Sequence, residues 1–194
     1  MTTLAAGFAD PSHDSQRVFR AVLDAFSHPG RIIAVPAEVE TPGALSAATT
    51  AFLLTFIDRE TPLWLAPQLD SAEVRDFVRF HAGAPVVADA AAAIFAFATT
   101  AREPMLAGLA IGTDPYPDRS ATLVIQAPSL RDGPTRTLRG PGIDGSTTAG
   151  IAGLADSFWS EWAANRALFP CGIDVVFTAG TELLALPRSI TVEG

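Results

Sequence analysis

The chain has 194 residues, enough for one good-sized domain, and 48% of them are hydrophobic, which is ample for a buried core. The formal net charge of −8 argues against binding to nucleic acid or to an anionic membrane, because both need clustered positive charge. No apolar run reaches the roughly 20 residues of a membrane span, no secretory signal is evident, and a single cysteine excludes an intrachain disulfide. We therefore expect a cytoplasmic protein.

The positively charged residues have an unusual composition. All 13 residues counted as lysine or arginine are arginines, so the chain contains no lysine. A Schiff base with pyridoxal phosphate needs a lysine amine, and a Walker A phosphate loop also needs a lysine. Both are therefore excluded, and any charged side chain that holds a phosphate here has to be an arginine.

The first half of the chain alternates between helical patterns and short apolar runs. Apolar residues that recur every three or four positions predict helices, and runs bounded by proline or glycine predict strands. The expected elements, in chain order, are a helix at 10–30, a strand at 31–36, a helix at 42–58, a strand at 61–67, a helix at 70–83, and strands at 84–87 and 93–99. The alanines between the last two strands could instead extend a helix.

The second half of the chain is richer in strand patterns. The expected elements are a short helix at 104–112, strands at 121–130 and 135–140 on either side of a hairpin-type turn, a helix at 152–169, and strands at 173–180 and 182–193. This order is typical of a mixed sheet with helices on its faces. We predict one α/β domain over residues 1–194, built as a three-layer mixed sheet with helices on both faces.

Residues 139–145, Arg-Gly-Pro-Gly-Ile-Asp-Gly, match the glycine spacing of a dinucleotide-binding fingerprint. A true fingerprint follows a buried parallel strand and opens a helix, but here a polar segment precedes the glycines and a poor helix former follows Gly145. Pro141 also removes an N–H that a phosphate would need. We therefore interpret Gly140 and Gly142 as residues of a tight turn beyond a hairpin strand, and no cofactor site is predicted.

The sequence offers no catalytic or metal-binding motif. His13, His28 and His81 are too far apart in sequence to form a metal-binding pair, so we expect structural roles for them. Cys171, between a proline and a glycine, is interpreted as a small buried hydrophobe. Two aspartates, at 114 and 118, flank a Pro-Tyr-Pro loop and are expected at the surface.

Asp174 is harder to explain, because it lies at the start of an apolar strand, where a carboxylate needs a partner. If residues 173–180 and 182–193 form a hairpin, Arg188 comes close to Asp174. The two side chains would then form either a structural ion pair or a pair that faces a ligand.

Six stretches of the chain form a specific combination in their order and spacing. They include FRAVLDAFSHPG, GPGI and FPCGID, and they cover residues 7–32, 49–65, 79–87, 121–130, 138–143 and 169–189. This combination resembles the PhnH family of the bacterial carbon–phosphorus lyase system, which degrades organophosphonates. Gly145 is not part of the family pattern, so the third glycine of the apparent fingerprint is expected to be coincidental.

The resemblance implies an α/β fold similar to that of the pyridoxal-phosphate-dependent transferases, in a homodimer that does not use that cofactor. It also implies that the chain joins the G, I and J subunits of a core complex. Together with the L subunit, the G, H and I subunits are associated with displacing adenine from ATP by a phosphonate. The product is a ribose 1-phosphonate 5-triphosphate. Within that transferase complex the resemblance implies a scaffold or accessory subunit without catalytic, cofactor or metal residues.

Two other functions remain open from the residues alone. In the first, the chain itself binds the phosphonate or nucleotide in a crevice, for which Arg139, Asp174 and Arg188 are the candidate residues. In the second, the fold is kept for packing and dimerisation is its main role.

Overall fold

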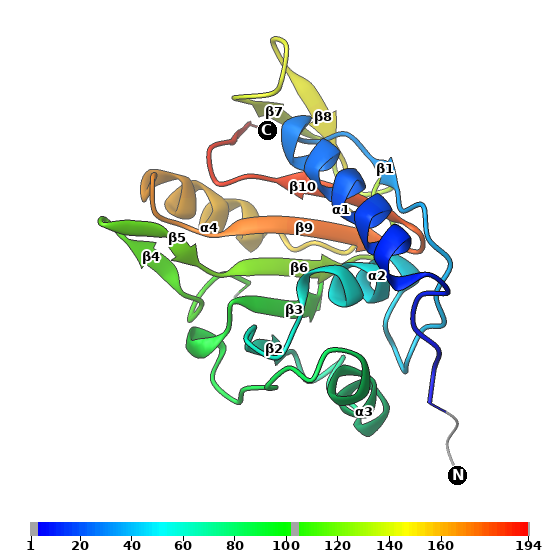
Figure 1. The fold of residues 1–194 in the computed structure, drawn as a ribbon. Coiled ribbons are helices and arrows are strands. Elements are labelled where there is room, and N and C mark those ends of the chain that lie inside the picture. The colour runs from blue at the N-terminus through cyan, green and yellow to red at the C-terminus, as the bar shows by residue number, and fades with distance from the viewer. Residues whose placement is uncertain (1–3, 102–104, 194) are drawn as a thin grey trace.

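The computed structural model describes residues 4–101 and 105–193 (Figure 1). Its elements, in chain order, are α1 (Pro11–Ser27), β1 (Ile33–Ala34), α2 (Ala47–Phe56), β2 (Leu63–Leu65), α3 (Ala72–His81), the 3₁₀ helix η1 (Ala90–Ala92), β3 (Phe95–Thr99), β4 (Ile111–Thr113), β5 (Tyr116–Ser120), β6 (Thr122–Gln126), β7 (Arg136–Arg139), β8 (Thr147–Ala149), α4 (Asp156–Ala167), β9 (Asp174–Ala179), β10 (Glu182–Leu186) and β11 (Thr191–Glu193). The four long helices and most of the strands lie where the sequence predicts them.

The largest sheet has six strands in the order β1-β10-β9-β6-β3-β2. Strands β2, β3, β6 and β9 run parallel, whereas β10 and β1 each run antiparallel to their neighbours. The central strands β3, β6 and β9 are buried over nearly their whole length, as expected for parallel strands covered on both faces.

Two buried clusters cover the two faces of this sheet. Helices α1, α2 and α3 pack on one face, where Phe52 lies edge-on to Phe97 with ring centroids 6.3 Å apart. Helix α4 packs on the other face, where Phe158 and Phe177 are 5.7 Å apart. Figure 1 shows α1 and α2 lying in front of the strands. Helices therefore lie on both faces of a mixed sheet.

Helix α1 begins as its sequence directs. Asp10 caps it by accepting the His13 amide at 3.1 Å, and a proline occupies the first turn, where no intrahelical N–H bond is lost. Val18, Val22 and Ala25 then face the core at helical spacing. Among the described residues, no helix is both long and apolar enough to cross a membrane.

The second half of the chain forms two smaller sheets, β11-β7-β8 and β4-β5, which differ from the strands that the sequence predicts there. The predicted strand at 182–193 is wrong as a single element, because Pro187 follows β10 and the chain then leaves the main sheet, so that β11 pairs with β7. Strand β7 does not form a hairpin with β6 either; it lies between β11 and β8 in a separate three-stranded sheet.

The predicted short helix at 104–112 is wrong for the residues that the structure describes; Pro104 lies outside them. Residues 105–110 form turns, and Ile111 already belongs to β4, which forms a hairpin with β5 at the left of Figure 1. Gly108 and Gly112 have φ angles of +81° and +78°, which a helix does not tolerate. The predicted strand at 84–87 is reduced to one isolated bridge to β2.

Candidate functional site

The glycine-rich stretch forms the connection between β7 and β8. The Ile143 amide donates to the Gly140 carbonyl at 3.1 Å, and Gly140 and Gly142 have φ angles of +144° and +84°. The interpretation as a tight turn is therefore confirmed. A Cβ atom on Gly142 would lie 2.4 Å from the carbonyl oxygen of Ser27 and 2.9 Å from Cδ of Pro29. The turn is thus packed directly against the end of α1.

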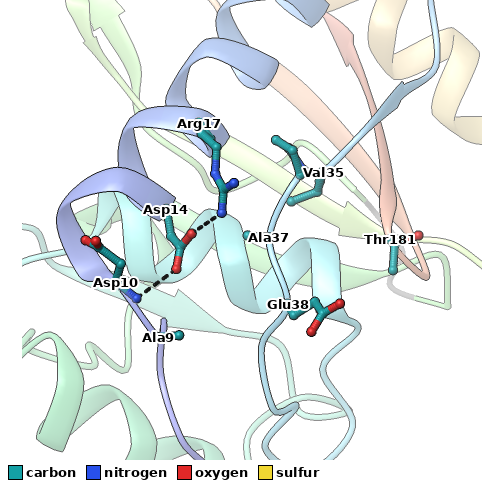
Figure 2. A pocket seen from close by; sticks show the side chains of 9 residues that line it. Ala9, Asp10, Asp14, Arg17, Val35, Ala37, Glu38 and Thr181 are labelled. Carbon is teal, nitrogen blue, oxygen red and sulfur yellow. Dashed lines mark hydrogen bonds and ion pairs between the residues drawn. The ribbon is translucent and has the colours of Figure 1, made fainter.

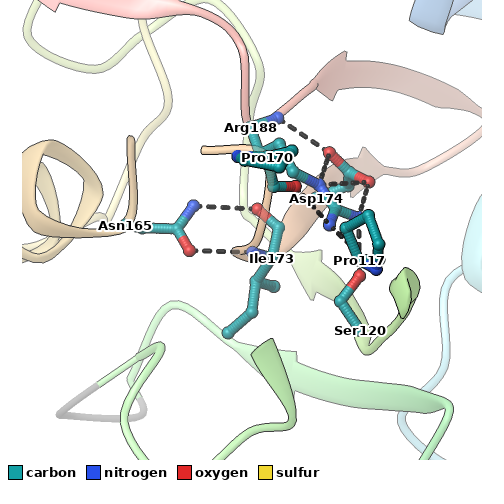
Figure 3. Close-up of polar contacts among 7 residues, drawn as sticks. All are labelled: Pro117, Ser120, Asn165, Pro170, Ile173, Asp174 and Arg188. Atoms are coloured by element: carbon teal, nitrogen blue, oxygen red, sulfur yellow. Dashed lines mark hydrogen bonds and ion pairs between the residues drawn. The ribbon is translucent and has the colours of Figure 1, made fainter. Parts of the chain in front are cut away.

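Asp174 and Arg188 are neighbours because β9 and β10 form the expected antiparallel hairpin. The Arg188 guanidinium donates through Nη2 to Asp174 Oδ2 at 2.5 Å and through Nε to Oδ1 at 3.1 Å (Figure 3). The Arg188 amide also donates to Oδ1, at 2.7 Å. The predicted pairing is confirmed. Only 15% of the Arg188 side chain and 21% of the Asp174 side chain are exposed.

The remaining guanidinium hydrogens of Arg188 point at other parts of the chain. Nη1 donates to the carbonyls of Pro117 at 2.9 Å and Pro170 at 3.5 Å, and Nη2 donates to Ser120 Oγ at 2.6 Å. Every guanidinium N–H therefore has an acceptor within the protein. Arg188 ties the β4–β5 hairpin and the segment before β9 to the main sheet, which favours a structural role over ligand binding.

Asn165 makes a second polar contact beside this network. From the buried side of α4 its Nδ2 donates to the Ile173 carbonyl at 2.9 Å, and its Oδ1 accepts the Ile173 amide at 2.8 Å (Figure 3). Because both polar groups of the side chain are satisfied, Asn165 can be buried at low cost. It fixes the segment that leads into β9.

Arg139 has different contacts from those of Asp174 and Arg188. It belongs to β7, and its side chain donates to Glu193 and to the Gly145 carbonyl, both at 3.3 Å. None of these contacts is shared with Asp174 or Arg188. The structure therefore does not join the three predicted crevice residues into one constellation, and their ligand-binding role stays a prediction.

The carboxyl ends of the parallel strands are where open α/β sheets usually bind ligands. Here Gln126, at the end of β6, accepts the Ser46 amide at 2.7 Å and the Thr49 hydroxyl at 3.1 Å. Thr49 also bonds to Thr178 of β9 at 2.8 Å. At the N-terminus of α2, Ser46 Oγ accepts the Thr49 amide at 3.3 Å and the Gly180 carbonyl accepts the Ala48 amide at 2.8 Å, so these two donors, which could attract an anion, are taken up within the chain.

A cavity of about 650 Å³ opens beside the start of α1 (Figure 2). Three carboxylates line it, those of Asp10, Asp14 and Glu38, whereas Arg17 is its one lining arginine and is paired with Asp14. The amide of Asp10 and the guanidinium of Arg17 hold the pKa of Asp14 below its usual value. The carboxylate stays ionised, so this cavity is poorly suited to a phosphate or phosphonate.

Comparison with known proteins decides the family. A sequence model described as "Bacterial phosphonate metabolism protein (PhnH)" matches residues 6–193. The chain belongs to the PhnH family. It is 40% identical over 190 residues to the "Alpha-D-ribose 1-methylphosphonate 5-triphosphate synthase subunit PhnH" of Rhizobium meliloti (strain 1021), covering 97% of this chain and 95% of that relative. It is 29% identical over 174 residues to the "Putative C-P lyase subunit protein HtxG" of Stutzerimonas stutzeri, covering 90% and 83%.

Two of the stretches that carry the PhnH resemblance meet in space. The end of α1, with its His-Pro-Gly, and the Gly-Pro-Gly-Ile turn are brought together at Gly142. At Gly145, in contrast, no atom lies within 4 Å of an added Cβ, so close packing does not require a glycine there. The glycines of the turn therefore serve close packing in this PhnH chain.

The cysteine, the three histidines and the two aspartates singled out in the sequence form no binding site among the described residues. Cys171 is buried, and the aspartates at 114 and 118 are exposed, as predicted. The ring nitrogens of His13 and His28 contact carboxylates of α1 or its cap, and His81 contacts the Ala5 carbonyl. Within residues 4–101 and 105–193, no group of three or more histidine, cysteine or acidic residues could hold a metal ion.

The residues that matter most in these networks were missed from the sequence. Ser120, Asn165 and Gln126 were not singled out, although each carried a signal: a polar residue that borders or interrupts an apolar element. A buried amide in an aromatic-rich helix, such as Asn165, implies a specific partner, but the sequence does not reveal which one.

Replacing Gln126 by leucine should destabilise this PhnH chain by about 1–3 kcal/mol. The Ser46 amide and the Ala44 carbonyl, which Gln126 bonds at 2.7 and 2.8 Å, would lose their partner. Urea unfolding measures the change. The same substitution at the exposed Gln16 of α1 is the matched control and should change stability by less than about 0.5 kcal/mol. Equal effects at the two sites would contradict the role given to Gln126.

Proposed function

We propose that this PhnH chain is an accessory subunit of a carbon–phosphorus lyase complex. In that complex it would support the formation of a ribose 1-phosphonate 5-triphosphate from ATP and a phosphonate. The observation that carries the proposal is the match along nearly the whole chain to a relative named as a subunit of that synthase. We further propose G, I and J subunits as its partners, a homodimer for the isolated chain, and a cytoplasmic location.

The contacts of the chain support an accessory rather than a catalytic role. The donors of Arg188 are all taken up within the chain, and the carboxyl ends of the central strands are filled by Gln126 and its partners. The cavity beside α1 carries mostly negative charge. None of these three places offers free positive charge to a phosphonate or a triphosphate.

We also propose kinship with the fold of pyridoxal-phosphate-dependent transferases. A mixed sheet with helices on both faces is compatible with that fold. The chain could not form the internal Schiff base of those enzymes, because it contains no lysine. The kinship would therefore concern architecture and not chemistry.

Co-expression with the G, I and J subunits of the same organism tests the proposal. With an affinity tag on the I subunit, the chain should be recovered in a fixed ratio to its partners after size-exclusion chromatography. A chain that elutes alone while the other three subunits form their complex would contradict the proposed function. Sedimentation velocity of the isolated chain separately tests whether it is a dimer.

A further inference from the structure

Two large apolar side chains lie one turn apart on the outer side of α1. Phe19 and Leu23 are four residues apart, which places them on one side of the helix, and they are 49% and 55% exposed. Val18 and Val22 already form the apolar stripe by which α1 packs on the core. A second apolar strip in water is unfavourable unless something covers it.

Helix α2 extends this apolar surface. The ring of Phe56, at the end of α2, is half-buried, and its centroid lies 5.8 Å from that of Phe19. Helix α2 carries no charged residue between Ala47 and Phe56, although a helix at the surface usually has a polar outer side. Figure 1 shows α1 and α2 together on the near side of the main sheet. We call the surface formed by Phe19, Leu23 and Phe56 the α1–α2 face.

One charge of each sign lies beside the α1–α2 face on α1. Arg20 is exposed, and 41% of the Asp24 side chain is exposed. Asp24 contacts His28 Nδ1 at 2.9 Å and Arg31 Nη1 only at 4.0 Å, whereas Arg20 has no carboxylate within 4.0 Å in residues 4–101 and 105–193. Within one helix, a base four residues before an acid is the poorer orientation for an ion pair. Both charges are therefore open to a partner.

A second copy of the chain matches this pattern by symmetry. A twofold axis perpendicular to α1 sets the two α1 helices antiparallel, so that the order of residues on one copy is reversed on the other. With the axis near Ala21, Phe19 of one copy meets Leu23 of the other, and the long side chain of Arg20 reaches Asp24 of the other copy. Each contact then occurs twice. The remaining charged side chains of α1 are paired within the helix or its cap and do not oppose this match.

We propose that the α1–α2 face is the surface by which two copies of this chain form a dimer. The two α1 helices pack antiparallel, their apolar side chains cover each other, and Arg20 of each copy pairs with Asp24 of the other. This inference rests on the part of the proposed function that makes the isolated chain a homodimer, and it adds the surface and the pairing. A different polypeptide would gain both ion pairs only by carrying an acid and a base in the reversed order.

Charge reversal tests the pairing between copies. Arg20→Glu and Asp24→Arg, each alone, set like charges together twice, so each should raise the dimer dissociation constant at least about ten-fold at low salt. In an equimolar mixture of the two variants, both ion pairs of a mixed dimer are restored with reversed sign. The mixture should therefore dimerise within about three-fold of the wild-type constant. A loss of dimer caused by misfolding would not be repaired by mixing.

Sedimentation velocity over a range of concentrations measures these constants and also tests the apolar contact. Leu23→Glu should raise the dissociation constant at least about 30-fold, because the substitution enters the interface twice. The matched controls lie on α3: Phe80→Glu, where the phenylalanine is 71% exposed, and Arg79→Glu, where the arginine side chain is 80% exposed. Both controls should stay within about two-fold of wild type, and every variant should keep the wild-type melting temperature within a few degrees.

The outcomes separate the inference from the proposed function. If wild type dimerises and Leu23→Glu dimerises equally well, the inference is overturned while the proposed homodimer stands. If the mixture of the two charge variants stays monomeric, the antiparallel pairing is wrong. If Leu23→Glu keeps the dimer but is no longer recovered with the tagged I subunit, the face binds another subunit and the inference is wrong. If wild type is a monomer throughout, the homodimer and the inference fail together, whereas recovery with the I subunit still decides the accessory role.

Discussion

Replacing Gly142 by alanine should destabilise the chain by about 3–4 kcal/mol, a large part of the stability of an ordinary domain. Two costs combine at this residue. Its φ angle of +84° is unfavourable for any residue with a Cβ, and that Cβ would lie 2.4 Å from the carbonyl oxygen of Ser27. Backbone cannot move aside as a flexible side chain can, so the turn and the end of α1 would have to separate. Urea unfolding followed by circular dichroism measures the loss.

Gly145 supplies the matched control three residues away. Its φ angle is +70°, but no atom lies within 4 Å of an added Cβ. Gly145→Ala should therefore cost only the backbone strain, about 1 kcal/mol. If the two substitutions were equally costly, the close packing of the turn against α1 would not be the reason for Gly142.

Replacing Arg188 by methionine should cost about 2–4 kcal/mol and loosen the β4–β5 hairpin. Methionine keeps an apolar stem but leaves the largely buried carboxylate of Asp174 without its bidentate partner. The carbonyl of Pro117 and the hydroxyl of Ser120 lose their donor at the same time. Hydrogen exchange should show faster amide exchange in β4 and β5, which a purely electrostatic loss at β9 would not produce.

An exposed ion pair provides the comparison for Arg188. Arg131 pairs with Glu182, where the side chains are 56% and 31% exposed, so Arg131→Met should cost less than about 1 kcal/mol. A double-mutant cycle with Asp174→Asn should give a coupling energy above about 1 kcal/mol for Arg188. A coupling near zero, or unchanged exchange in the hairpin, would contradict its role as a brace.

The elements that the sequence predicts well are those with local signals. Helix α1 has a cap, a continuous apolar face and a His-Pro-Gly end, and all three depend on neighbouring residues. The pairing of Asp174 with Arg188 was also predictable, because a hairpin fixes its register through a short turn. The Gly-Pro-Gly turn was recognised because its surroundings did not fit a nucleotide-binding loop.

The parts that were predicted wrongly depend on distant residues. Residues 105–112 are held out of a helix by Gly108 and Gly112 and by Glu161, which lies 55 residues beyond Leu106 in the chain. The apolar run after Gly180 is divided between two sheets because β11 finds its partner in β7. Likewise, the roles of Ser120 and Asn165 could not be predicted locally, because their hydrogen-bond partners, Arg188 and Ile173, reach them only in the folded chain.

The central claim is that the chain acts as an assembled subunit and holds no substrate by itself. Calorimetric titration of the isolated, folded chain with millimolar ATP and then methylphosphonate tests it most directly. The contacts of Arg188 and the closed ends of the sheet predict only the heat of dilution for either ligand. A saturable heat would contradict the claim and make the chain a ligand-binding subunit. Its disappearance in Arg139→Ala, a substitution at an exposed arginine, would place the ligand at that residue.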